Sequence, residues 1–474
     1  MSAANDAAAA LRRRRILEGP ILPTLLALAG PTVVVLLVQT GVGVAETYFV
    51  SNLGTAALAG VALVFPALML MQMMSNGGIG GGVSSAVARA IGAGRGRDAD
   101  ALVLNALAVA IVLGLVFTAA ELLWGRALFT VMGGRDGVLA AALGYADIVF
   151  AGSVLIWITS LFAAALRGSG NVVVPAIVTL AGAVIVVPLS PALIFGWGPL
   201  PRMGVAGAGI AVIIYYLAAT LALFAYLRAG RGALRLPLDP RLVQWRLLAD
   251  ILRVGGLSAL GTVQMNLTVT LVTGLVGRFG ADAVAGYGVA SRLDYLLIPL
   301  LFSVGTASLT MVGTNIGARQ FRRARRIAWT AALIGAGLTE AIGVAAAVFP
   351  QAWLGIFTGE PAVLTAGALY FRSVAPFYGL VGLGMLLYFS GQGAGRVFWP
   401  FIGGTARLAI AGIGGWLAIA LWGQGLGMLF GLVAAASISY GGVTALAMLI
   451  SPWGPKPQPA RVLEPEREEV ATTT

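Results

Sequence analysis

The sequence predicts an all-helical protein that crosses a membrane about twelve times, in two halves of six helices each. Three observations support this fold class. Of the 474 residues, 59% are hydrophobic and 10% are charged, whereas about a quarter of the residues in a soluble domain are charged. The mean hydropathy is +0.94. Glycine and proline motifs also repeat at a nearly constant distance along the chain, which indicates two equivalent halves.

The apolar segments account for the predicted number of spans. Because a helix needs about 20 apolar residues to cross the hydrocarbon core, the region between Ile21 and Ile450 accommodates about a dozen spans joined by short loops. The predicted spans are 22–50, 56–88, 99–124, 139–166, 172–196, 204–227, 249–277, 283–314, 325–349, 364–391, 397–422 and 427–450. Six is an even number, so both halves enter the membrane with the same orientation. We therefore expect a pseudo-two-fold axis along the membrane normal.

Hydrophilic segments divide the chain into five parts. Residues 1–20 precede the first span, and residues 21–227 form the predicted N-terminal six-helix lobe. Residues 228–248 contain arginines and prolines and are predicted to be a cytoplasmic linker. Residues 249–450 form the predicted C-terminal six-helix lobe, and the tail at 451–474 is rich in Pro and Glu, a composition typical of disorder.

The basic residues predict the orientation in the membrane. The net charge is +12, and most of it falls in alternate loops. One side carries Arg12 to Arg15, Arg95, Arg97, Arg228, Arg231, Arg235, Arg241, Arg246, Arg253, Arg319, Arg322, Arg323, Arg325, Arg326, Lys456, Arg461 and Arg467, and the other carries Arg126, Arg135, Arg202 and Arg278. By the positive-inside rule we expect both termini in the cytoplasm and the protein in the plasma or inner membrane. Because the charge follows topology, the expected partner is the lipid bilayer and not nucleic acid.

The sequence contains no cysteine and no histidine. Disulfides, thiol chemistry, histidine proton relays and most zinc and haem ligation are therefore excluded. The acidic residues are scattered, so we expect neither an enzyme nor a metal or organic cofactor. A carboxylate must carry any proton or ion chemistry.

Short motifs recur in the second half of the chain. Gly168, Gly170 and Pro175 recur 225 residues later as Gly393, Gly395 and Pro400. At the same offset, Ile91-Gly92-Ala93 recurs as Ile316-Gly317-Ala318, and Tyr145 recurs as Tyr370. Gly54 and Ala59-Gly60 recur 226 residues later, as Gly280 and Ala285-Gly286. Chance matches are expected among 66 glycines, but the nearly constant offset favours an internal repeat. A cleft between two such halves is the geometry that alternating access requires.

The same residues carry a family resemblance that covers the chain from about residue 20 to residue 450. The stretch from Gln39 through Ala45-Glu46-Thr47 to Asn52-Leu53-Gly54 resembles the opening of MATE (multidrug and toxic compound extrusion) proteins, members of the MOP flippase superfamily. The turns at Ile91-Gly92-Ala93-Gly94 and Gly391-Gln392-Gly393-Ala394-Gly395 are similar to other turns of that family. No single motif is decisive, but their order and spacing are specific.

The resemblance implies a secondary active transporter that exports lipophilic, often cationic small molecules (drugs or toxins) in exchange for H⁺ or Na⁺. It also implies a working monomer. One alternative is a flippase for lipid-linked precursors, although few lysines or arginines fall within the predicted spans. Export of a specific metabolite is the other alternative.

Glu46 is the best candidate for the coupling carboxylate. It is the one acidic or basic residue between Ile21 and Val50. A charged side chain within a span costs at least about 2.5 kcal/mol, so it is seldom kept without a partner or a role. Glu46 falls in the outer third of the bilayer, about one turn before the loop. The alternative is that it reaches headgroups or pairs with a cation such as Arg278.

The chain departs from the family pattern near this carboxylate. Many members carry an asparagine and an aspartate in the fifth span, where this chain has Val186 and Ser190. A single carboxylate favours proton over sodium exchange, because sodium prefers several oxygen ligands. The preference is weak, since Gln39, Asn52 and backbone carbonyls could complete a cation cage.

Other polar residues of the spans are candidates for the substrate or ion cavity. These are Gln39, Tyr48, Asn52, Gln72, Asn76, Ser190, Gln264, Asn266 and Tyr287, near methionines Met69, Met71, Met73 and Met74. Methionines and aromatic rings suit flat, lipophilic cations, although simple packing of the methionines is equally plausible. Pro188 and Pro191 predict a bend in the fifth span that could act as a gate. The glycines at 77–82 lie inside a span and predict close helix packing.

The remaining ionisable residues of the spans have simpler interpretations. Glu340 is expected to form a helix–helix hydrogen bond or to remain a structural acid. Arg292 and Asp294 are two residues apart, do not face each other and are expected to bond to neighbouring helices. Glu121 lies near a predicted span end, where interfacial solvation explains it.

Overall fold

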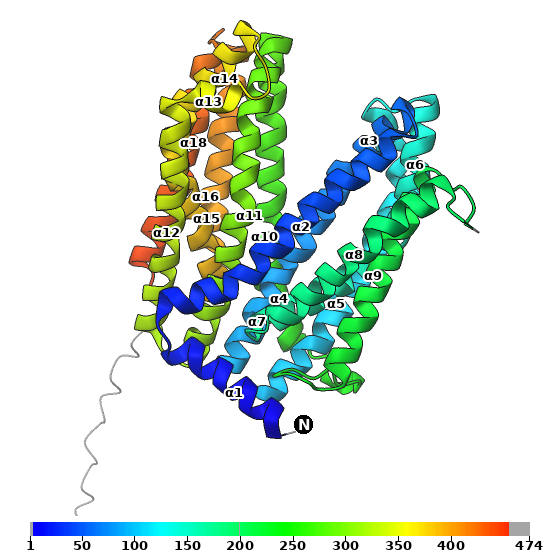
Figure 1. Cartoon of the computed structure of the whole chain (residues 1–474). Coiled ribbons are helices and arrows are strands. Elements are labelled where there is room, and N and C mark those ends of the chain that lie inside the picture. Colours follow the sequence, from blue (N-terminus) through cyan, green and yellow to red (C-terminus); the bar gives the residue numbers. More distant parts are fainter. Residues whose placement is uncertain (1–2, 199, 455–474) are drawn as a thin grey trace, which may run out of the picture.

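Figure 1 shows the computed structural model, which describes residues 3–198 and 200–454. The described part of the chain is helical throughout, without a strand. The helices are α1 (Ala3–Glu18), α2 (Ile21–Ser51), α3 (Thr55–Met73), the π-helix η1 (Met74–Gly78), α4 (Ile79–Gly92), α5 (Gly96–Val131), α6 (Asp136–Ala151), α7 (Ser153–Gly168), α8 (Val173–Phe195), α9 (Val205–Arg228), η2 (Pro240–Leu242), α10 (Trp245–Val276), η3 (Gly277–Phe279), α11 (Ala281–Gly317), α12 (Phe321–Val348), α13 (Pro350–Leu354), α14 (Pro361–Val374), η4 (Ala375–Phe377), α15 (Tyr378–Gly393), α16 (Phe398–Leu408), the π-helix η5 (Ala409–Gly414), α17 (Gly415–Ala420) and α18 (Leu426–Ile450).

The number of spans agrees with the prediction. Eleven helices or helix runs are long and apolar enough to cross a membrane, and a twelfth span results if α6 and α7, which meet at 51°, are counted as one broken span. We call residues 21–228 the N-half and residues 245–450 the C-half. The predicted fold class, an all-helical membrane protein of about twelve spans, is confirmed.

The internal repeat is visible in the helix bounds. The helices α5, α6, α7 and α8 begin at Gly96, Asp136, Ser153 and Val173, and α12, α14, α15 and α16 begin 225 residues later, at Phe321, Pro361, Tyr378 and Phe398. Backbone conformations repeat too: φ is 104° at Gly54 and 101° at Gly280, and 79° at Gly170 and 72° at Gly395. Glycine enters this left-handed region without strain, so the motifs recur because the same turns recur.

The first helix of each half packs against both halves. Early in α2, Leu25 lies in an apolar cluster with Met311 of α11, whereas α2 also packs on α8 of its own half. The helix α10 is arranged in the equivalent way, with Ile251 in the N-half cluster and Val272 in the C-half cluster. In Figure 1, α2 accordingly runs diagonally from the C-half to the N-half. This crossing was not predicted from the sequence.

The two halves meet at one end of the bundle only. We call this end, which carries α1 and Arg95, Arg97 and Arg322, the basic end, and the opposite end the far end; in Figure 1 the two groups of helices diverge toward the far end. Among the described residues, hydrogen bonds between helices of the two halves reach no farther than Met73, whose Sδ lies 3.7 Å from Asn266 Nδ2. Met73 is 18 residues after the start of α3, or about 27 Å along the helix.

The predicted linker is shorter than expected and packs on the N-half. α9 ends at Arg228 and α10 begins at Trp245, so the connection is 229–244. Its Leu236 is fully buried, and Asn105 of α5 donates to Leu242 O at 2.9 Å and accepts from Gln244 N at 3.1 Å. The connection is therefore fixed to α5. The predicted N-terminal segment contains the helix α1, and most of the predicted tail, 455–474, lies outside the described residues.

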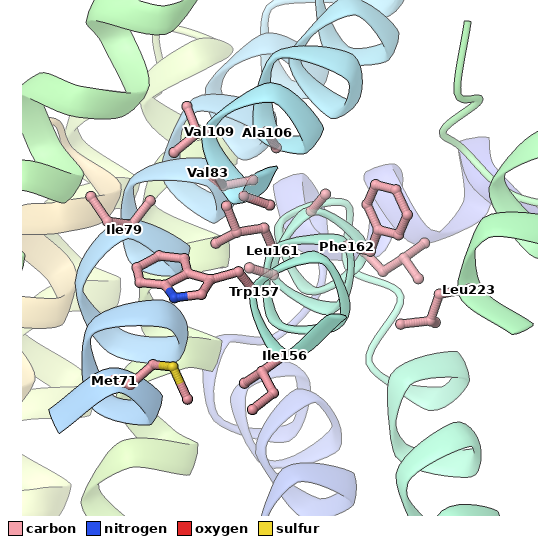
Figure 2. Close-up of a cluster of buried hydrophobic side chains, with 14 of the residues drawn as sticks. Met71, Ile79, Val83, Ala106, Val109, Ile156, Trp157, Leu161, Phe162 and Leu223 are labelled. Carbon is pink, nitrogen blue, oxygen red and sulfur yellow. The ribbon is translucent and has the colours of Figure 1, made fainter. Parts of the chain in front are cut away.

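The N-half core is centred on α7. Trp157, Ile156, Leu161 and Phe162 of this helix are fully buried. Figure 2 shows them surrounded by side chains of α3, α4, α5 and α9, among them Met71, Ile79, Val83, Val109 and Leu223. Burial of these four large side chains stabilises α7 against the surrounding helices. This core holds α4, which forms the contact between the halves.

Candidate functional site

The π-helix η1 interrupts the second span where the N-half packs on α10 of the C-half, and we call the residues around it the floor. Glycines of η1 and α4 allow close approach, since a Cβ added at Gly78 would lie 2.9 Å from the Cα atom of Ala259 in α10, and one at Gly81 2.6 Å from Gln392 Oε1 in α15. The prediction of close helix packing at 77–82 is therefore confirmed. π-helical turns occur frequently at functional sites. This one connects α3 to α4 in the chain and packs on α10.

Polar side chains gather at this floor. Gln72 and Asn76 are half-buried, and Asn76 Nδ2 donates to Gln72 O at 3.2 Å. From the C-half, Asn266 Nδ2 donates to Thr262 O at 2.9 Å and contacts Met73. The structure thus brings three of the predicted cavity residues together, beside one of the predicted methionines.

Gln392 and Tyr388 complete the floor and were not predicted as site residues. Gln392 Nε2 donates to Gly77 O at 3.0 Å and to Tyr388 Oη at 2.8 Å. Gln392 was interpreted only as part of a turn, in Gly391-Gln392-Gly393. The one feature of the sequence that could have identified Gln392 as a site residue is its position between two glycines at the end of a span.

Glu46 lies on α2, five residues before the far end of the helix, or about 8 Å along it. Its side chain is half-buried, and its Oε1 is inaccessible and has no hydrogen-bond partner among the described residues. The neighbours of its carboxyl group include Ser190 of α8 and Tyr145 of α6. Ser190 is fully buried and its hydroxyl also has no partner of good geometry in the described part of the chain. The Glu46 carboxyl group and the Ser190 hydroxyl are therefore each other's nearest polar groups among those identified in the described residues.

The structure does not join the other α2 candidates to this carboxyl group. Tyr48 is 66% exposed, and Asn52 Nδ2 donates to Tyr48 O at 2.8 Å, which caps the end of the helix. Gln39 is exposed, two helical turns before Glu46. Glu46 and the polar floor are separated by roughly 20 Å along the helices, so they are two distinct sites.

The candidates of the C-half lie apart from Glu46. Gln264 Nε2 donates to Thr405 Oγ1 at 2.7 Å. Tyr287 is 8% exposed and lies inside the C-half, where its ring centroid is 5.3 Å from that of Tyr370 and 6.2 Å from that of Phe430. Tyr287 therefore belongs to a buried aromatic cluster.

Asp294 carries the second buried carboxyl group next to this aromatic cluster. Tyr370 Oη donates to its Oδ2 at 2.6 Å, and its Oδ1 has no hydrogen-bond partner among the described residues. The expected bond to a neighbouring helix is confirmed. Tyr370 is the repeat equivalent of Tyr145, so each half places one carboxyl group near the same tyrosine. Sequence spacing could not reveal this, because Glu46 and Asp294 are not equivalent to each other.

The remaining acids differ in their agreement with the predictions. Glu340 Oε2 accepts from Gly379 N at 2.7 Å, the helix–helix hydrogen bond that we expected. The interpretation of Glu121 as an interfacial residue is wrong, because α5 continues for ten residues beyond it to Val131 and its side chain is 6% exposed. Pro188 and Pro191 lie within α8, which continues from Val173 to Phe195. Their gating role stays a prediction.

Two crossing half-bundles with buried carboxyl groups and a polar floor define a polytopic membrane transporter. The family model MatE matches residues 31–192 and 258–417. The chain belongs to the MATE family of the MOP superfamily of transporters, which are not enzymes.

Similar proteins agree with this family. A probable multidrug resistance protein NorM of Deinococcus radiodurans is 30% identical over 436 residues, which cover 88% of this chain and 93% of that protein. A FAD transporter of Shewanella oneidensis is 26% identical over 375 residues, 78% of this chain and 82% of that protein. A solved structure of a multidrug resistance MATE family transporter, described as outward-facing, has a TM-score of 0.81 at 24% identity and covers 92% of this chain and 96% of its own.

Proposed function

We propose that this protein exports lipophilic, cationic small molecules in exchange for protons, with Glu46 as the coupling carboxylate. The observation that carries the proposal is the environment of Glu46: an unpaired, inaccessible carboxyl oxygen inside a span, beside a hydroxyl group and a phenol ring. An acid that binds and releases a proton avoids the cost of a permanent charge in the membrane, which is about 2.5–3.5 kcal/mol at the helix centre.

The orientation supports this direction of exchange. The positive-inside rule assigns the basic end to the cytoplasm, so the far end opens to the outside. By the same argument we propose that both termini lie in the cytoplasm and that the protein lies in the plasma or inner membrane. Glu46 then lies within about 8 Å of the outer end of its helix. Protons from outside reach it while the substrate leaves by the same opening.

The polar floor is the proposed site for the substrate. Gln72, Asn76 and Asn266 offer amide groups, and Met73 offers a polarisable sulfur atom beside them. A mixture of amides and a flexible thioether accommodates ligands of different shapes. Relatives named as multidrug resistance or export proteins, such as YoeA of Bacillus subtilis and MepA of Staphylococcus aureus, support export of several compounds. We propose that the protein works as a monomer.

Efflux from proteoliposomes tests the proposal. Ethidium is loaded, a proton gradient or a sodium gradient is imposed, and wild type is compared with Glu46→Gln. We expect a proton gradient alone to drive efflux and Glu46→Gln to abolish the driven component. Glu121→Gln is the matched control, because it removes another buried carboxylate of the N-half from α5, which packs on α6 and α7. Normal proton-driven efflux by a folded Glu46→Gln variant would remove Glu46 from the mechanism.

A second candidate is the export of one metabolite. It is favoured by the relative named a FAD transporter, whose similarity to this chain is comparable to that of the multidrug proteins. The same vesicles loaded with FAD decide between the two, since efflux of FAD without efflux of ethidium supports the specific exporter. Transport of neither compound would favour the alternative that the protein is a flippase for a lipid-linked precursor.

A further inference from the structure

Arg89, on α4, makes the main polar contact between the halves at the basic end. Its NH2 lies 2.7 Å from Asp250 Oδ1 on α10, and its NH1 donates to Gly393 O on α15 at 3.4 Å. Its NH1 also bonds to Ser85, and the Ser85 hydroxyl donates to Gln392 O. The Arg89 side chain is 15% exposed, so one N-half arginine is bonded to two C-half helices at once.

The backbones around Arg89 are in direct contact. A Cβ added at Gly92 would overlap the backbone of Thr314 on α11, and one added at Gly317 would overlap the backbone of Arg89 itself. Gly92 and Gly317 are repeat equivalents, so α4 and α11 cross with the glycine of each helix against the backbone of the other. This crossing leaves no room for water, and the halves cannot separate at the basic end without carrying Arg89 away from Asp250.

The repeat shows that the ion pair is not required for this packing. The offset is 226 for the segment that ends at Gly60 and 225 after Ile91, so the equivalent of Asp250 is Thr24 and that of Arg89 is Thr314. The equivalent contact, between α2 and α11, has no ion pair: both threonines are buried, and the Thr314 hydroxyl donates to Thr310 O of its own helix at 2.9 Å. The α4–α10 contact thus has a charged pair at a position where its counterpart has two threonines.

A charged pair at such a contact has a physical advantage over an apolar one. Replacing a buried pair by apolar residues is often neutral or stabilising, so the pair is poor evidence for stability and better evidence for a switch. A cavity of about 320 Å³ at the basic end is lined by Asp250, Arg246 and Arg253, and the Asp250 side chain is 45% exposed. Water therefore reaches the pair and can solvate both charges when they separate.

We propose that Arg89 is a positioning residue whose pair with Asp250 latches the basic end closed while the far end is open. The latch rests on the proposed function, because alternating access requires this end to open. Breaking the pair releases α4 from α10 and α15 together, and water from the cavity replaces the lost contacts. The repeat-equivalent contact between α2 and α11 stays packed and keeps the first part of α2 on the C-half.

Distances between spin labels test the latch, and the natural lack of cysteine means that introduced cysteines are the only labelling sites. Arg97→Cys with Arg322→Cys reports on the basic end, and Thr55→Cys with Ala281→Cys on the far end; each pair is exposed and repeat-equivalent or nearly so. We expect Arg89→Gln, and separately Asp250→Asn, to raise the fraction of long distances at the basic end about tenfold and to shorten the far-end distances. The partly exposed Asp250 gives a variant that folds even where Arg89→Gln does not.

Arg95→Gln is the matched control, since it removes an exposed arginine paired with Asp98 at the same end, at 3.0 Å. Unchanged distances in a folded Arg89→Gln or Asp250→Asn variant would overturn the latch. An equal shift in Arg95→Gln would also overturn it, because the effect would then reflect net charge. The distances are measured without substrate or gradient, so they remain informative if the proposed transport activity fails in vesicles.

Discussion

The two equivalent turns at the basic end make a quantitative prediction about backbone strain. Arg319, between α11 and α12, has φ of 60°, and its repeat equivalent Gly94, between α4 and α5, has φ of 73°. A side chain in the left-handed conformation costs about 1–2 kcal/mol, whereas glycine there loses about 0.5–1 kcal/mol of chain entropy relative to alanine. Arg319→Gly should therefore raise the free energy of unfolding by roughly 0.5–1 kcal/mol.

The matched change is Gly94→Ala, which should lower the free energy of unfolding by about 1 kcal/mol. No atom lies within 4 Å of a Cβ added at Gly94, so this variant isolates the backbone term. Both variants are unfolded by adding SDS to mixed micelles, with tryptophan fluorescence as the signal and a linear extrapolation to zero SDS. Destabilisation by Arg319→Gly, or no effect of Gly94→Ala, would refute the assignment of strain to these turns.

Three further predictions concern buried polar contacts. Asp294→Ala removes the acceptor and Tyr370→Phe the donor of the 2.6 Å bond between α11 and α14, and each should cost about 1–3 kcal/mol of unfolding free energy. The double variant, measured by the same SDS titration, should cost less than the sum of the two, and full additivity would show that the two groups do not interact. Gly78→Val places a side chain against the Ala259 backbone, so proton-driven efflux should fall at least tenfold. Gly256→Val is the control: this glycine has open space around it, and the variant should retain proton-driven efflux. Asn105→Ala removes both hydrogen bonds to the connection at 229–244. Because the connection is then held less tightly to α5, cleavage by trypsin after Arg231 or Arg235 should accelerate roughly fivefold or more. An unchanged cleavage rate would mean that Leu236 alone holds this segment.

Several features of the fold were predictable because they are local. The apolar segments fix the number of spans, since each must be long enough to cross the hydrocarbon core. The turns at Gly54, Gly170 and Gly395 were found from their spacing, and each has the positive φ that glycine tolerates. The glycine-rich stretch at 77–82 was correctly assigned to helix packing, because closely spaced glycines within a span are a local feature of the sequence.

The predictions about single charged side chains were less successful. Glu121 was placed at an interface because the end of its helix was set too early, and a helix end is hard to locate where apolar residues continue through it. Gln392 was overlooked as a site residue because its partner Gly77 lies 315 residues away. Asp294 was assigned its structural hydrogen bond correctly, but its proximity to the equivalent of Tyr145 depends on the packing of α11 against α14.

The sequence by itself determined the helical class and the repeat and selected Glu46 as the candidate coupling residue, because apolar length, motif spacing and an isolated acid in a span are properties of short segments. Only the tertiary structure decided that α2 and α10 each cross to the opposite half, and that Arg89 meets Asp250 across 161 residues of chain. These contacts follow from which helices approach closely. Close approach is possible where a glycine leaves room for the backbone of the facing helix, as Gly92 does for Thr314 and Gly317 for Arg89. Which helices meet depends on the whole surfaces that pack and not on any one segment.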